Sequence, residues 1–264
     1  MSKAEAAYID NVTRYRDGAR RSAEKMLTIL FDLIRPTSVV DVGCSAGTWL
    51  SVAKTLGANQ TLGLDGDYVD RNALLIPSNE FIAVDLSKPF KVARQFDLVI
   101  SLEVAEHLPE QSALDFVECL TNLGSIILFS AAVPFQGGTG HINEQWPDYW
   151  AALFSRCGYV PFDCIRWQVW GDESVDVWYA QNSLLYVARP LLATNAALAE
   201  RLQALSVRAL NVVHPTLYLG SADPRNVDPT MLSAAQCLEG LRFHAKGYLR
   251  RSLHWRLQRL LFPA

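Results

Sequence analysis

The stretch Val39–Leu50, VVDVGCSAGTWL, decides the fold that we predict for this chain. Its valines and one acid, Asp41, form a short apolar run of the kind that builds a buried parallel strand. A tight turn from Gly43 to Gly47 follows, and a helical pattern opens at Thr48. Strand, glycine turn and helix in this order predict the ligand-binding end of a doubly wound α/β sheet, where backbone amides are free at the start of the helix.

The glycine spacing separates two families that use such a turn. A dinucleotide-binding G-x-G-x-x-G would need glycine at positions 45 and 48, which hold Ser45 and Thr48. The pattern is instead D-x-G-x-x-x-G. It resembles motif I of class I S-adenosylmethionine-dependent methyltransferases, D/E-x-G-x-G-x-G, with Ser45 in place of the middle glycine. The resemblance implies S-adenosylmethionine as the cofactor.

Length and charge narrow the range of partners. The chain has 264 residues, half of them hydrophobic, and a net charge of −3. That length suffices for one α/β domain with an addition, and the charge does not favour a nucleic-acid partner. Five cysteines without a C-x-x-C pair indicate reduced thiols, and residues 1–11 lack the apolar core of a signal peptide. We therefore expect a cytoplasmic protein without a membrane span.

Acids follow the next two predicted strands, 61–64 and 81–84. Asp65 lies 18 residues after Gly47, a distance at which an acid in such folds accepts hydrogen bonds from ribose hydroxyls. Asp85 follows the third strand. The family resemblance implies that Asp85 meets the adenine amino group and that Leu86 packs on the ring. The alternatives are a turn aspartate at 65 and a strand-end cap at 85.

The fourth predicted strand, Phe96–Ser101 (FDLVIS), resembles motif IV of the same family. Because ligands lie beyond the carboxyl ends of such strands, the residues after Ser101 should face the reactive methyl group. We assign cofactor contacts to Asp41, Gly43, Cys44, Gly47, Asp65, Asp85, Leu86 and Ser101.

The segment after this strand, Glu103-Val-Ala-Glu106-His107, offers two carboxylates and an imidazole. A helix would place them on one face, as a divalent-metal site requires. The segment resembles the E-x-x-E-H of metal-dependent O-methyltransferases that act in ubiquinone biosynthesis or on the 2′-hydroxyl of small RNAs. The small-RNA enzymes add a histidine from the loop after strand five, the position of His141. The predicted ligands are Glu103, Glu106, His107 and His141.

The ion expected from this mixture of ligands is Mn²⁺, Fe²⁺, Co²⁺ or Zn²⁺, with Mg²⁺ less suited because it prefers oxygen. Metal-free relatives also carry E-H-L after this strand. The competing hypothesis is therefore a metal-free N- or C-methyltransferase in which His141 or His107 is the general base. In either case the predicted catalytic residues are His141, His107 and Glu106.

The domain boundary is predicted at Arg189-Pro190. Residues 1–190 would form the methyltransferase domain, with a helix over 3–34 and an antiparallel strand pair near 159–170 and 177–188. Residues 191–264 would form a helical extension with helices over 194–212 and 229–261. Its end, 242–264, has six basic and no acidic residues, with leucines at helical spacing. This pattern is typical of peripheral membrane contact or a homo-oligomer interface, or of a packed helix with a solvated basic face.

The predicted fold is thus a doubly wound, seven-stranded Rossmann-like methyltransferase sheet with its last strand antiparallel. The predicted function is methyl transfer from S-adenosylmethionine to a hydroxyl of a small molecule or glycan, with nucleic acid not expected as a partner. The rivals are a Rossmann dehydrogenase or epimerase and a non-catalytic binding module. The missing middle glycine and the absence of Y-x-x-x-K after strand four disfavour the first. The intact Asp41, Gly43, Gly47, Asp65 and Asp85 disfavour the second.

Overall fold

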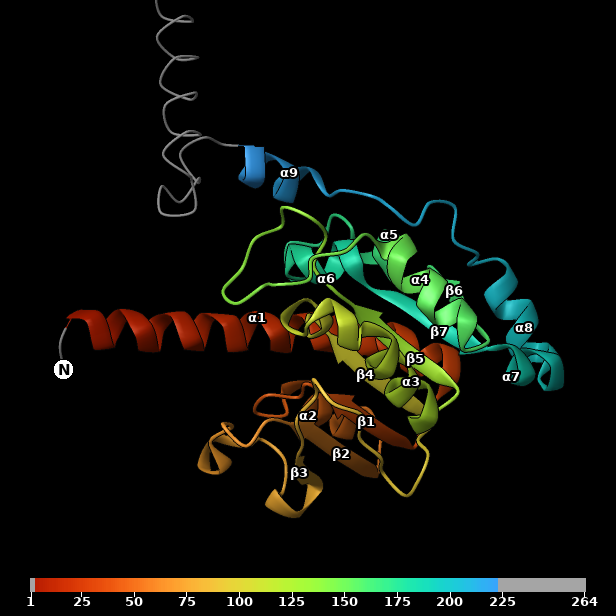
Figure 1. Cartoon of the computed structure of the whole chain (residues 1–264), viewed down its shortest axis with the longest axis horizontal. Helices are drawn as coiled ribbons and strands as arrows, with labels where there is room; N and C mark the ends of the chain where they lie inside the picture. Colours follow the sequence, from red (N-terminus) through yellow and green to blue (C-terminus); the bar gives the residue numbers. More distant parts are fainter. Residues whose placement is uncertain (1–2, 223–264) are drawn as a thin grey trace, which may run out of the picture. The chain divides into compact units, whose positions relative to one another are not determined.

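The computed structural model describes residues 3–222, and the side chains of residues 16–221 (Figure 1). The strands are β1 (Ser38–Val42), β2 (Gln60–Asp65), β3 (Phe81–Ala83), β4 (Leu98–Leu102), β5 (Ile126–Ser130), β6 (Tyr159–Phe162) and β7 (Leu184–Ala188). The α-helices are α1 (Lys3–Ile34), α2 (Thr48–Thr55), α3 (Ala113–Leu123), α4 (Pro147–Arg156), α5 (Arg166–Val169), α6 (Val177–Asn182), α7 (Arg189–Thr194), α8 (Ala196–Gln203) and α9 (Pro215–Ala222).

The strands form one seven-stranded sheet in the order β3-β2-β1-β4-β5-β7-β6. β1 to β5 run parallel, whereas β7 pairs antiparallel with both β5 and β6. The chain reverses direction along the sheet between β3 and β4, so that β4 lies on the other side of β1. This is the switch point at which doubly wound sheets bind ligands. The predicted fold, including the antiparallel seventh strand, is confirmed.

Each face of the sheet packs its own hydrophobic core. On β1, Val39 belongs to the core beneath α1, α2 and α8, and Val40 belongs to the core beneath α3 and α4. Leu98 and Val99 alternate in the same way on β4. Side chains of consecutive strand residues point to opposite faces, so a strand covered by helices on both sides must be apolar throughout. This explains the unbroken apolar runs of the sequence.

Both strands expected between 159 and 188 are shorter than predicted, and each has a helix beside it. β6 ends at Phe162, and α5 forms because the buried guanidinium of Arg166 donates to Asp163 and to the carbonyls of Ala209 and Leu210. Residues 177–182 form α6 instead of a strand. Pairing of β5 with β7 stops at Leu184, so the residues before it have no strand partner.

The extension after β7 also differs from the expectation. The predicted helix over 194–212 is shortened to α8, because the backbone at Leu205 and Ser206 pairs with Asp163 and Phe162 at the edge of β6. The compact unit that contains the sheet reaches Tyr218, and Leu198 and Leu202 are buried in its core. The division at residue 190 stays a prediction.

The helix predicted over 229–261 and the basic segment 242–264 lie outside the described residues. Within residues 3–222, none of the helices has the length and apolar character that a membrane span requires.

Candidate active site

A cavity of about 780 Å³ lies at the carboxyl ends of β1, β2, β3 and β4. Four of the eight predicted cofactor residues line it: Gly43 after β1, Asp65 at the end of β2, and Asp85 and Leu86 after β3. The volume is in the range of small-molecule and cofactor pockets. The cavity therefore lies where the sequence pattern places a nucleoside ligand.

The turn after β1 has little room for a side chain. Gly43 adopts φ +88°, a conformation that disfavours any residue with a Cβ, and its amide donates to the carbonyl of Leu64 at 2.7 Å. A Cβ at this position would overlap Cγ2 of Val104, which follows β4 and also lines the cavity. Glycine is therefore required for the turn to pack between β2 and β4.

Asp65 is held by three donors. Its Oδ2 accepts from the amide of Ser45 at 2.7 Å. Its Oδ1 accepts from the amide of Gly66 at 2.7 Å and from the hydroxyl of Tyr68 at 2.6 Å. Behind it, burial and then the charge of Asp65 raise the pKa of Asp41 well above its usual range. Asp65 is thus the hydrogen-bond acceptor that the cavity presents on the β2 side.

Asp85 is exposed, and the Lys88 ammonium and Ser87 lower its pKa to about 2. Leu86 beside it is buried against the core.

Neither Cys44 nor Gly47 lines the cavity. Cys44 points its sulfur at β2, where a Cβ on Gly63 would approach it at 2.6 Å, and Gly47 (φ +80°) packs on Ile76. The side chain of Ser101 is fully buried in β4.

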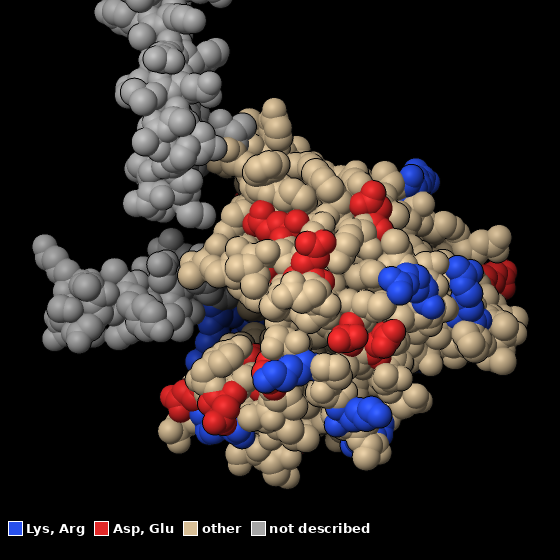
Figure 2. Space-filling model, in the orientation of Figure 1, with Lys and Arg blue, Asp and Glu red and all other residues tan. Residues whose placement is uncertain are grey.

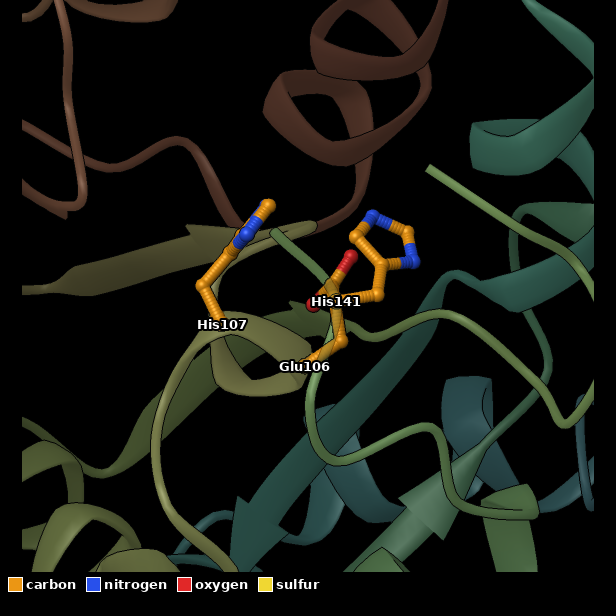
Figure 3. A group of neighbouring side chains, drawn as sticks. All are labelled: Glu106, His107 and His141. Carbon is orange, nitrogen blue, oxygen red and sulfur yellow. The ribbon is translucent and has the colours of Figure 1, made fainter. Parts of the chain in front are cut away.

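A second group of side chains borders this cavity. One ligand atom each of Glu106, His107 and His141 lies within 4.8 Å of the others. Figure 3 shows the Glu106 carboxylate between the two imidazole rings, whose centroids are 4.8 Å apart. His107 also lines the cavity. A ligand in the cavity and a group bound by this cluster would therefore be neighbours.

The loop that carries His141 is tied to Glu106 through the backbone. The amides of Ile142 and Asn143 both donate to the Glu106 carbonyl, at 2.9 and 3.0 Å. These bonds join a loop after β5 to the turn after β4. The proximity of His141 to Glu106 and His107 is thus set by main-chain hydrogen bonds and not only by side-chain rotamers.

Both histidines form a hydrogen bond through the same ring nitrogen, Nδ1. Nδ1 of His107 lies 3.2 Å from the Gly140 carbonyl, which can only accept, so Nδ1 is the protonated nitrogen. Nδ1 of His141 lies 2.9 Å from Oε1 of Glu144, a carboxylate that also accepts from the amides of Phe135 and Gly137. Partial burial lowers the pKa of His107. With Nδ1 as the donor, the neutral form of each ring has its lone pair on Nε2, the state in which histidine binds a metal or accepts a proton.

Glu106 is the unusual member of the group. It is fully buried, and neither carboxylate oxygen has a hydrogen-bond partner among the described residues. Burial, and then the Glu103 carboxylate, raise its pKa well above the usual range. A buried carboxylate without partners is costly unless something at the site satisfies it. One carboxylate and two imidazoles fit a transition-metal ion or Zn²⁺ well.

A family model described as a methyltransferase domain matches residues 12–163, more than half of the chain. The chain belongs to this family of methyltransferase domains. The predicted class, S-adenosylmethionine-dependent methyltransferases of class I, is thereby confirmed, as is S-adenosylmethionine as the methyl donor.

This methyltransferase is similar to one curated protein and to several solved structures. The ribosomal RNA large subunit methyltransferase E of Methanocorpusculum labreanum is 30% identical over 136 residues, covering 49% of this chain and 67% of that protein. Human N-acetylserotonin methyltransferase in complex with S-adenosylmethionine superimposes with TM-score 0.45 and 16% identity over 63% of this chain, which spans 51% of the human chain. The methyltransferase domain of bacterial CtHen1 superimposes with TM-score 0.48 and 18% sequence identity. The match covers 64% of this chain and 97% of the CtHen1 domain.

Glu103 of the methyltransferase departs from the predicted arrangement. It has φ +54°, and residues 105–107 form a short 3₁₀ turn in place of the expected α-helix. Its carboxylate accepts from Gln136 at 2.9 Å and from Asn182 at 3.1 Å, and it is not in the cluster of three. The helical face proposed for Glu103, Glu106 and His107 is therefore not formed, and Glu103 as a ligand stays a prediction.

Several site residues have no signal in the sequence of the methyltransferase. Tyr68 and Val104 line the cavity, and Gln136 and Asn182 hold Glu103. None belongs to a recognisable motif. The contact of Glu144 with His141 likewise depends on how the loop between β5 and α4 closes.

Replacing Glu144 with glutamine should lower the free energy of unfolding by about 1–3 kcal/mol. A glutamine has one acceptor oxygen, whereas Glu144 uses Oε1 for Gly137 and His141 and Oε2 for Phe135. Urea unfolding of E144Q would measure the loss. E118Q, on the exposed face of α3, is the matched control and should be neutral. Equal stability of E144Q and the parent would show that the carboxylate does not brace the loop.

Proposed function

We propose that this chain transfers a methyl group from S-adenosylmethionine to a hydroxyl oxygen of a small molecule or glycan, with a divalent metal held by Glu106, His107 and His141. The observation that carries the proposal is that His107 belongs both to the cavity and to the cluster. A methyl donor in the cavity and a hydroxyl at the cluster would meet at this residue.

Each part of the site has a separate task in this proposal. Asp65, Asp85 and Leu86 hold the nucleoside end of the cofactor, and the turn at Gly43 lets it approach the backbone. Glu106, with its unpartnered oxygens, and the Nε2 atoms of His107 and His141 hold the ion. When bound, the metal would lower the pKa of the acceptor hydroxyl and hold its oxygen in place. The enzyme then needs only to align this oxygen with the methyl–sulfur bond.

A metal-free reaction is the second candidate, favoured by the tautomers of the two histidines. Nε2 of His107 or of His141 carries a free lone pair and could accept the acceptor's proton as its oxygen or nitrogen bonds the methyl carbon. This mechanism leaves the two unpartnered oxygens of Glu106 unexplained. In the metal mechanism these oxygens would bind the ion.

The acceptor class is inferred from charge. The segment 36–190 contains 18 acidic and 8 basic residues. On the face in Figure 2, the basic side chains of the described residues are scattered between acidic ones. The residues that line the cavity include four acidic side chains and no Lys or Arg. A phosphate backbone needs a positive surface, so an uncharged hydroxyl compound suits this site better than RNA. The rRNA methyltransferase relative makes RNA the alternative to test.

Chelation should remove activity. The purified chain would be incubated with methyl-labelled S-adenosylmethionine and either an RNA pool or a pool of sugars and phenols, with EDTA, Mn²⁺ or Co²⁺. We expect label in the second pool only, lost in EDTA and restored by Mn²⁺ or Co²⁺. Full activity in EDTA, with no metal by elemental analysis, would favour the histidine base. Label in RNA would overturn the acceptor class.

A further inference from the structure

The ribose acceptor of the cofactor site is already occupied by a side chain of the protein. A ribose diol donates two hydrogen bonds, and a carboxylate oxygen accepts about two. Oδ2 of Asp65 accepts one, from Ser45, and has room for one more. Oδ1 accepts from both Gly66 and Tyr68. One donor must therefore leave Oδ1 before both ribose hydroxyls can bind Asp65 in the bidentate way.

Tyr68 is the donor that can leave. The amides of Ser45 and Gly66 are part of the backbone, which the β1–α2 turn and the end of β2 hold in place. The Tyr68 side chain is instead 84% exposed, and only its hydroxyl end reaches into the site. Its ring lies directly over Gly66, where any Cβ would overlap it. Rotation of this side chain toward solvent would free Oδ1 without moving the backbone.

Tyr68 is also a reliable donor. Desolvation of its hydroxyl, together with the hydrogen bond to Asp65, raises the pKa of Tyr68 to about 12. The phenol is therefore protonated near neutral pH and competes for Oδ1 at all ordinary conditions.

We infer that Tyr68 is a residue of the cofactor site whose hydroxyl takes the place of one ribose hydroxyl on Asp65 and must be displaced when S-adenosylmethionine or its product binds. The inference rests on the proposed role of Asp65 as the ribose acceptor. Tyr68 then sets the cofactor affinity. Its hydroxyl satisfies Asp65 while the site is free, and this hydrogen bond must be broken when the cofactor binds, which lowers the net binding free energy.

The test is titration of the full chain with S-adenosylhomocysteine by calorimetry. Tyr68→Phe keeps the ring and removes the competing hydroxyl, so it should bind about fivefold more tightly than the parent. Tyr218→Phe is the matched control, since Tyr218 is 63% exposed on α9 and does not line the cavity, and its affinity should not change. Asp65→Ala should bind at least about tenfold more weakly. In the Asp65→Ala background, Tyr68→Phe should give no gain.

The outcomes separate the inference from the proposal beneath it. Tighter binding by Y68F that disappears in the Y68F/D65A pair supports the displacement of Tyr68. Unchanged or weaker binding by Y68F, with D65A still weakened, overturns the inference and leaves the cofactor placement intact. Parent-like affinity of folded D65A, checked by circular dichroism, would overturn both.

Discussion

Gly43→Val should abolish cofactor binding, with the affinity for S-adenosylhomocysteine falling at least about 100-fold, equivalent to about 2.7 kcal/mol. Two causes act together. The residue adopts φ +88°, which a β-branched side chain strongly disfavours, and a Cβ there would overlap Val104. Relief of that overlap must push Val104 or the turn into the cavity that both residues line. Calorimetric titration of the folded variant would measure the loss.

Gly57→Val is the matched control for Gly43→Val. Gly57 follows α2 and has φ +112°, so valine is strained there too, but a Cβ would meet nothing within 4 Å. Gly57→Val should lower the free energy of unfolding by about 1–2 kcal/mol and leave the cofactor affinity unchanged. If both variants bind S-adenosylhomocysteine like the parent, the cofactor does not occupy this cavity.

His141→Ala should reduce methyl transfer by about 10²–10⁴-fold while leaving S-adenosylhomocysteine affinity within about twofold. His141 belongs to the cluster with Glu106 and His107 but does not line the cavity, so its loss affects the acceptor side and not the cofactor side. The prediction holds for the metal mechanism and for a metal-free mechanism in which His141 is the base, since both use Nε2 of this ring. Turnover with labelled S-adenosylmethionine and calorimetry would be measured on the same preparation.

Ile142→Ala controls for disturbance of the loop. Ile142 is 66% exposed, and its contact with Glu106 uses the main-chain amide, which alanine retains. Its activity should stay close to that of the parent. Metal content by elemental analysis then separates the two mechanisms, because H141A should lose metal only if the ring is a ligand. An H141A enzyme with full turnover would remove His141 from the active site.

The sequence predicted most of the sheet because its evidence is local. The apolar runs at β1 and β4 are those of strands buried on both faces, and the structure packs a core on each side of them. Glycine at position 43 indicates a backbone with positive φ, a conformation that few other residues adopt. Pro147 similarly marks the start of α4. Such features depend on neighbouring residues, so they can be read before the fold is known.

The errors fall where tertiary contacts override local pattern. Residues 177–182 have the aromatic and apolar character of a strand but form α6, and the pairing of β5 with β7 ends at Phe129 and Leu184. Glu103 has the spacing of a helical partner of Glu106, yet its conformation is set by contacts outside that segment. Its amide donates to Ser130 just after the end of β4, and its carboxylate accepts from Gln136 and Asn182. Neither outcome is encoded within a few residues of the site.

By itself, therefore, the sequence determined the doubly wound sheet, the glycine turn and the acids that follow β2 and β3, because strand burial and positive φ are properties of short stretches. Only the tertiary structure decided which side chains meet. His141 reaches Glu106 because two amides of a distant loop bind one carbonyl, and Tyr68 covers Asp65 because its ring folds back over Gly66. Convergence of this kind depends on how loops close between strands, and loop closure depends on hydrogen bonds between residues far apart in the chain.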